Sequence, residues 1–113
     1  MRQCIQPTAY KNLMLVPGST ALATLERSAV TQEGMGLAIS RALSKLWDDF
    51  DYVLIDSPPT LGVLLINALA ASEQLIVPVQ TEFLAIKGVE RMLNTLQMVN
   101  RSRRHPLPFL MVP

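Results

Sequence analysis

The hydrophobic positions of this chain alternate between two patterns along its length. Short aliphatic runs bounded by proline, glycine or charged residues predict strands at residues 13–16, 52–55, 74–77 and 108–112. Apolar residues three and four apart, or a longer run apolar on every side, predict helices at about residues 20–27, 35–47, 61–71 and 85–100. This alternation predicts an α/β fold of about four strands, with a parallel sheet and helices on both faces.

The composition fits one small α/β domain. Of the 113 residues, 50% are hydrophobic and 17% are charged, and aliphatic runs of this kind suit parallel strands buried on both faces. The formal net charge of +1 gives no general attraction to nucleic acid or membrane. A single cysteine, Cys4, excludes an internal disulfide framework and a thiolate zinc site.

The ends of the chain and its longest apolar run bear on where the protein works. The first ten residues show no clear pattern and the last ones end inside a predicted strand, so we expect residues 1–113 to form one partial domain. No charged region leads into an apolar stretch at the N-terminus, which predicts no signal peptide. The run at 61–71 contains Gly62 and Asn67 and is too short to span a bilayer. We therefore expect a soluble, cytoplasmic protein without membrane contact.

The predicted strand at 52–55 ends on Asp56, and two prolines follow almost at once, at Pro58 and Pro59. In open parallel sheets, ligands bind at the carboxyl ends of the strands, which is where this prediction places Asp56. The prolines hold the next segment extended and delay the following helix. Two interpretations are evenly matched on this geometry: a carboxylate that holds a magnesium ion beside a nucleotide, and an aspartate that closes a local turn.

Two stretches of sequence carry a family resemblance. The stretch FDYVLIDSPPTLGVLLINALAASEQLIVPVQTEFLAIKGVERML closely resembles the central part of the ParA/Soj family, relatives of MinD with a deviant phosphate-binding (Walker A) loop, and NLMLVPGSTALATLE resembles the segment before it. The run Asp-Ser-Pro-Pro-Thr-Leu-Gly favours the ParA branch. The stretches VQTEFLAIKGVERML and NRSRRHPLPFLMVP look most like the ParA-type proteins found beside flagellar and chemotaxis genes in gamma-proteobacteria.

The resemblance implies a magnesium-dependent ATPase that forms a homodimer around ATP, binds DNA non-specifically and is reset by a ParB-like stimulating partner. Such cycles position chromosomes, plasmids or polar protein arrays. Asp56 then corresponds to the switch II aspartate beside the magnesium water shell. The switch II loop would comprise Ser57, Pro58, Pro59, Thr60 and Gly62. A contribution to the nucleotide pocket or dimer face would come from Gln80, Thr81 and Glu82, which otherwise form an ordinary polar loop.

The phosphate-binding loop of the family has no counterpart in this sequence. Its signature is Lys-Gly-Gly-x-Gly-Lys-Thr, whereas none of the five glycines here is followed by lysine. We therefore expect that this chain alone neither binds ATP and Mg²⁺ tightly nor hydrolyses ATP. The alternative is a truncated, non-catalytic relative that serves as a protein-interaction module through the helices at 61–71 and 85–100.

Three arginines, Arg101, Arg103 and Arg104, follow the chain's last predicted helix in a segment without acidic residues. Cations at that position stabilise the negative end of a helix dipole, which is the favoured interpretation. The alternative is contact with DNA phosphates.

Two further side chains and one strand edge complete the expectations. Trp47 is predicted to anchor the core, and Asn67 to be a hydrogen-bonded residue in the core or at the edge of its apolar helix. An exposed apolar strand edge predicts self-association.

Overall fold

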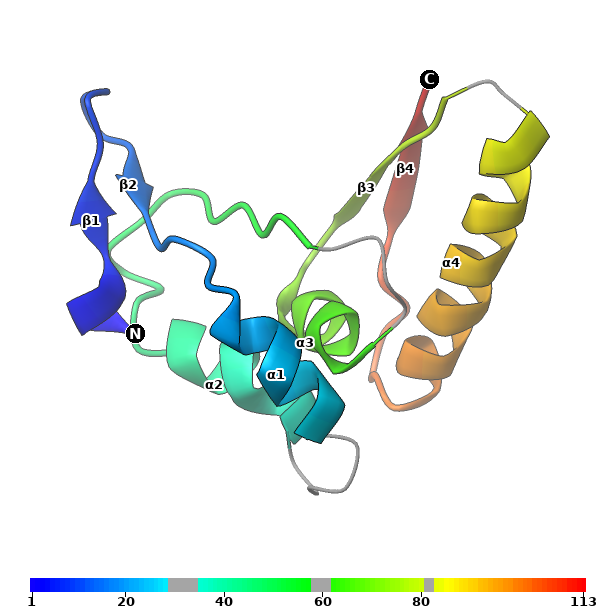
Figure 1. Ribbon diagram of the computed structural model, residues 1–113, viewed down its shortest axis with the longest axis horizontal. Helices are drawn as coiled ribbons and strands as arrows, with labels where there is room; N and C mark the ends of the chain where they lie inside the picture. Colours follow the sequence, from blue (N-terminus) through cyan, green and yellow to red (C-terminus); the bar gives the residue numbers. More distant parts are fainter. Residues whose placement is uncertain (29–34, 58–61, 81–82) are drawn as a thin grey trace.

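The computed structural model describes residues 1–28, 35–57, 62–80 and 83–113. Its elements follow the predicted order of short strands and helices (Figure 1). In chain order they are η1 (Arg2–Cys4), β1 (Gln6–Pro7), β2 (Met14–Leu15), α1 (Ala21–Ser28), η3 (Met35–Leu37), α2 (Ala38–Leu43), α3 (Val63–Ala71), β3 (Leu75–Pro78), α4 (Phe83–Arg101) and β4 (Phe109–Val112). No helix in these ranges is both long and apolar enough to cross a membrane.

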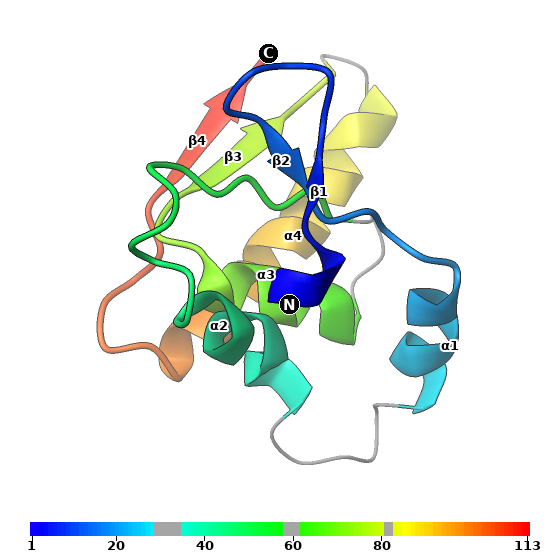
Figure 2. The same ribbon diagram turned by 90° about the vertical axis from the view of Figure 1, so that its left-hand side faces the viewer.

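Strands β3 and β4 form the parallel part of the sheet, joined by the crossover helix α4. Leu75 pairs with Phe109 and Pro78 with Val112, so the two strands end level with each other. Helix α4 runs along one side of this pair, as both views show (Figures 1 and 2). The α/β class and the parallel pairing of the last two predicted strands are confirmed.

The core lies between α3, α4 and the segment that enters β4. Leu65 and Leu69 of α3 are the most deeply buried, and they cluster with Leu96, Val99 and Leu107. Burial on several sides of α3 explains why its sequence is apolar all round rather than along one stripe. The predicted helix at 61–71 is thus confirmed as a buried helix, described from Val63 onward.

Helix α2 depends on a side chain from α3 at its start. The N-cap residue of α2, Leu37, makes no side-chain hydrogen bond that would cap the helix. Instead, the Ile39 N–H donates to Asn67 Oδ1 at 3.2 Å. Asn67 Nδ2 in turn donates to the Val63 carbonyl at 2.9 Å, and the residue is only 3% exposed. The prediction that Asn67 is a hydrogen-bonded core residue is confirmed. Asn67 serves as a capping residue supplied from another helix.

The predicted helix at 35–47 is shorter than expected, and the prediction for Trp47 is wrong. A 3₁₀ turn forms its start and α2 ends at Leu43, after which residues 44–49 form turns. Within these turns Leu46 still lies inside, at 4% exposure, whereas Trp47 faces outward, at 50%.

The predicted strand at 13–16 exists but pairs with an unpredicted partner. Only Met14–Leu15 are in β2, antiparallel to β1 near the N-terminus. Asn12, with φ of 64°, forms the turn between them, and Thr8 Oγ1 donates to the Leu13 carbonyl at 2.9 Å. This strand therefore belongs to a hairpin and not to the parallel sheet, and it lies apart from β3 and β4 (Figure 1).

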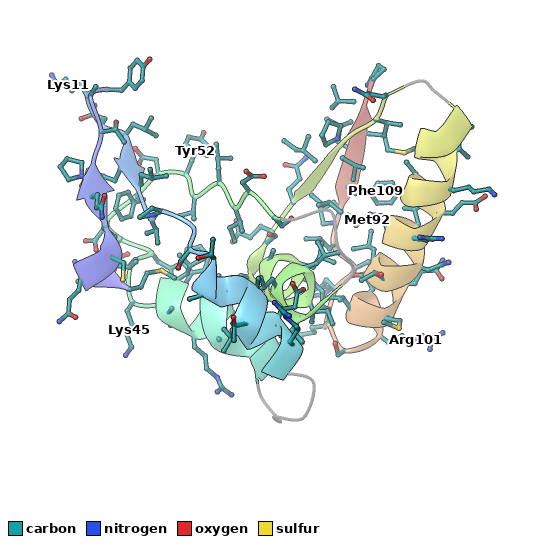
Figure 3. All side chains as sticks on the ribbon, in the orientation of Figure 1. Lys11, Lys45, Tyr52, Met92, Arg101 and Phe109 are labelled. Atoms are coloured by element: carbon teal, nitrogen blue, oxygen red, sulfur yellow. The ribbon has the colours of Figure 1, made fainter. Side chains whose placement is uncertain are left out.

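The predicted strand at 52–55 is not formed. Residues 52–57 are extended without a ladder partner in the part of the chain described here. Tyr52 and Leu54 are 89% and 91% exposed, and Figure 3 shows Tyr52 on a segment that runs between the two small sheets. Strand formation needs a neighbouring strand to accept and donate hydrogen bonds, and the described residues provide none here.

Candidate functional site

The predicted switch II segment leads from Asp56 into helix α3. Asp56 is exposed and Ser57 is half-buried, and among the residues that the structure describes the Asp56 carboxylate has no hydrogen bond or ion pair. Gly62 is the N-cap residue of α3 and offers no side chain to cap it. Pro58, Pro59 and Thr60 lie outside the described residues. Asp56 is thus free to accept a ligand, although it does not end a formed strand as the sequence predicts.

Gly62 lies against a side chain that sequence reasoning did not single out, Glu26 of α1. A Cβ built on Gly62 would overlap Glu26 Oε1 and lie 2.7 Å from Glu26 Cδ. Glu26 Oε1 is itself buried and has no hydrogen-bond partner in the ranges that the structure describes. The carboxylate therefore occupies the volume in which an N-cap side chain of α3 would sit. No sequence signal indicates this contact, because the two residues lie in separate elements.

Gln80 follows the aligned ends of β3 and β4. The Val79 N–H donates to the Val112 carbonyl at 2.8 Å, which extends the pairing by one residue, and Gln80 beyond it is exposed. Thr81 and Glu82 lie outside the described residues. No hydrogen bond joins Gln80 to Asp56 in the described ranges, so a shared pocket for the two stays a prediction.

The three arginines at the end of α4 separate into two kinds. The Arg103 guanidinium donates to the carbonyl oxygens of Leu69, Ala70 and Ser72, at 3.0, 3.4 and 3.2 Å. These carbonyls close the C-terminal end of α3, where acceptors lack helical partners and cations are favoured. Arg101 and Arg104 are exposed. The structure therefore ties Arg103 to α3 and leaves the other two facing solvent.

The donor set of the described residues does not by itself make a site for MgATP. Among them, no three histidine, cysteine, aspartate or glutamate side chains are grouped to hold a metal ion. Asp56 fits one part of such a site, because an unengaged carboxylate can hold a magnesium-bound water. A cradle of backbone amides with a lysine, which phosphates require, has no counterpart in the sequence.

Known proteins match nearly the whole chain. The family model described as an AAA domain matches residues 1–109. The sporulation initiation inhibitor protein Soj of Bacillus subtilis is 38% identical over 97 residues, covering 86% of this chain and 38% of its own length. The chromosome partitioning protein ParA of Myxococcus xanthus is 33% identical over 101 residues, covering 89% of this chain and 36% of its own length.

A solved structure matches the fold closely. The cobyrinic acid a,c-diamide synthase of Mycobacterium smegmatis, solved with a bound ATP analog and magnesium, has a TM-score of 0.89 at 38% identity, covering 99% of this chain and 46% of its own. The chain thus spans less than half the length of these relatives. On these matches, this chain belongs to the AAA-domain family, within its ParA/Soj group.

Proposed function

We propose that residues 1–113 form the central part of a nucleotide-binding domain in a magnesium- and ATP-dependent ATPase that partitions or positions cellular cargo. The observation that carries this proposal is the exposed Asp56 carboxylate, unpaired among the described residues and located on the segment that leads to α3, in a fold that resembles an enzyme solved with an ATP analog and magnesium. When bound, the magnesium ion would stabilise the charge that develops on the transferred phosphoryl group. Asp56 would orient its water shell, and the segment ending at Gly62 would respond to the nucleotide.

The further details of the cycle are part of the same proposal. They comprise a homodimer, a ParB-like stimulating partner, non-specific DNA as the track, and chromosomes, plasmids or chemotaxis arrays as the cargo. For DNA contact, Arg101 and Arg104 are better placed than Arg103, whose guanidinium is already occupied by carbonyl oxygens. The same proposal holds that this chain alone does not hydrolyse ATP, because its sequence supplies no phosphate cradle.

The test is ATP hydrolysis by the protein at the length found in its native cell, followed as phosphate release with and without magnesium. Asp56→Asn keeps the shape of the side chain and removes its charge, so turnover should fall at least about a hundredfold if Asp56 holds the magnesium water shell. Asp51→Asn is the matched control, since Asp51 is also exposed on the same segment. Full magnesium-dependent turnover by the Asp56→Asn protein would refute the role of Asp56. Turnover by residues 1–113 alone would refute the claim that this chain is inactive.

The second candidate is a non-catalytic interaction module. It is favoured by the apolar side chains that the described sheet leaves exposed, including Ile76, Phe109, Leu110 and Met111, each at least 45% accessible. The intact mass of the product in its native cell separates the two candidates. A mass more than double 12.5 kDa supports the ATPase, and a mass near 12.5 kDa supports the interaction module.

A further inference from the structure

One face of helix α4 presents to solvent a straight row of five side chains, three of which are cationic. Its members are four, three, four and three residues apart, the spacing that keeps side chains on one face of a helix. They are Lys87, Arg91, Asn94, Met98 and Arg101, and we call them the α4 stripe. At 1.5 Å per residue the stripe is about 21 Å long.

The α4 stripe lies opposite the buried side of the helix. Met92, Leu96 and Val99 pack into the core, whereas every member of the stripe is exposed. Figure 3 shows the same division, with Met92 on the inner side of α4 and Arg101 on the outer side. No packing within the described chain explains why the outward side chains are cationic.

The cations of the stripe have no partners among the described residues. The ion pair found in those ranges joins Arg2 and Asp49, at 2.7 Å. Within the same part of the chain, the side chains of Lys87, Arg91 and Arg101 take part in no hydrogen bond or ion pair. Their charge is therefore available to an external ligand.

The C-terminal part of the stripe, from Arg91 to Arg101, borders a shallow hollow of about 460 Å³. Its walls include Arg91, Asn94, Met98 and Arg101, and Met98 is 58% exposed between the two arginines. An exposed methionine flanked by unpaired cations offers one apolar contact and two charged ones. Flexible methionine side chains suit such contacts with a partner protein.

We infer that the α4 stripe is a docking surface for an acidic amphipathic helix of a partner protein. One apolar side chain of that helix would cover Met98, and its carboxylates would pair with Arg91 and Arg101. DNA fits this surface less well, because its phosphates are evenly spaced and offer nothing to Met98, while Glu90 beside Arg91 would repel them. A helix can place its carboxylates away from Glu90. This inference goes beyond the ATPase proposal and does not require nucleotide.

The experiment measures binding of a synthetic helical peptide to the intact protein by fluorescence anisotropy. The peptide carries one leucine, with glutamates three and seven residues before it and three and seven residues after it. These spacings match those from Met98 to Arg101 and from Met98 to Arg91, so the peptide can bind parallel or antiparallel to α4. A second peptide has glutamine in place of each glutamate, and random-sequence duplex DNA is the third ligand. The variant is Arg91→Gln with Arg101→Gln, and the matched control is Arg41→Gln with Lys45→Gln, two exposed cations away from α4.

We expect the acidic peptide to bind and the stripe variant to weaken its binding about tenfold, since each solvent-exposed ion pair contributes modestly. The control variant should bind like the wild type, and the glutamine peptide should bind as weakly as the stripe variant. No binding, equal weakening by both variants, or equal affinity for the glutamine peptide would overturn the inference. Two other results would also overturn it. If only DNA binds through the stripe, the occupant is DNA, and if sedimentation shows that the stripe variant no longer self-associates, the occupant is a second copy of the chain.

Discussion

The contact between Gly62 and Glu26 allows a quantitative test of how α1 is held against the start of α3. Gly62 has φ −135° and ψ −170°, an extended conformation that any residue adopts, so its backbone does not require glycine. What requires glycine is space, because a Cβ there would overlap the Glu26 carboxylate. The perturbation is Gly62→Ser, measured with and without Glu26→Ala.

The expected energies follow from three terms. Serine is a good N-cap residue, and replacing a glycine also restricts the unfolded chain, so without Glu26 the change should stabilise the protein by about 0.5–1 kcal/mol. With Glu26 present, its carboxylate is the far end of a flexible side chain and must move aside, which costs up to about 1 kcal/mol. The two single changes should therefore be coupled by about 0.5–1 kcal/mol, within the range known for residues in contact. Glu26→Ala alone should be nearly neutral, because the oxygen that it removes is buried and unpaired.

The assay is urea unfolding of all four proteins, followed by circular dichroism, with the coupling energy taken from the double-mutant cycle. Gly18→Ser serves as the matched control in the same cycle, since a Cβ at Gly18 would meet nothing within 4 Å. That control should be additive with Glu26→Ala. A coupling energy below about 0.3 kcal/mol for Gly62 would refute the contact, because it equals the scatter expected of independent sites.

Three further predictions rest on other parts of the chain. Arg103→Ala should lower the free energy of unfolding by about 1.5–3 kcal/mol, because it removes charged hydrogen bonds to the end of α3. The control Arg104→Ala should change it by less than about 0.5 kcal/mol, and equal effects of the two changes in urea unfolding would contradict the prediction. Asn67→Leu should cost about 1–3 kcal/mol and speed hydrogen exchange at the Ile39 amide, which loses its acceptor; unchanged exchange would rule out the cap. Gly88→Ala should raise the midpoint of thermal unfolding, because alanine is favoured over glycine by up to about 1 kcal/mol inside a helix and a Cβ at this position meets nothing within 4 Å. A lower midpoint would contradict the prediction.

The helices were predictable from sequence because the pattern that specifies them is local. In α4, apolar residues three and four apart indicate the buried side directly, and the observed helix, Phe83–Arg101, exceeds the predicted 85–100 by only a few residues. The prediction for Trp47 failed because periodicity assumes that a helix continues in phase. Helix α2 ends at Leu43, and in the turns after it Leu46 keeps an inward position whereas Trp47 faces outward.

The site was less predictable, because its contacts join distant segments. The sequence marks Asp56 and the residues up to Gly62 through their resemblance to a family, but Glu26 reaches Gly62 from another helix without any local signal. Arg103 is similar, since it lies 34 residues from the Leu69 carbonyl that its guanidinium contacts. Clustering along the sequence grouped Arg103 with Arg101 and Arg104, whereas the fold gives it a different environment.

The unpaired segment at 52–55 links the formation of the site to strand pairing. Its aliphatic side chains and its free backbone groups both favour burial between strands, and yet Leu54 is 91% exposed. Asp56 can be held at a sheet edge only if the residues before it are fixed in a strand. Pairing of 52–55 with another strand is therefore a precondition for the proposed role of Asp56. It follows that hydrogen exchange at the Val53 and Leu54 amides should be slow in any form of the protein that hydrolyses ATP. Rapid exchange at these amides in a fully active protein would refute the claim that the role of Asp56 depends on strand pairing.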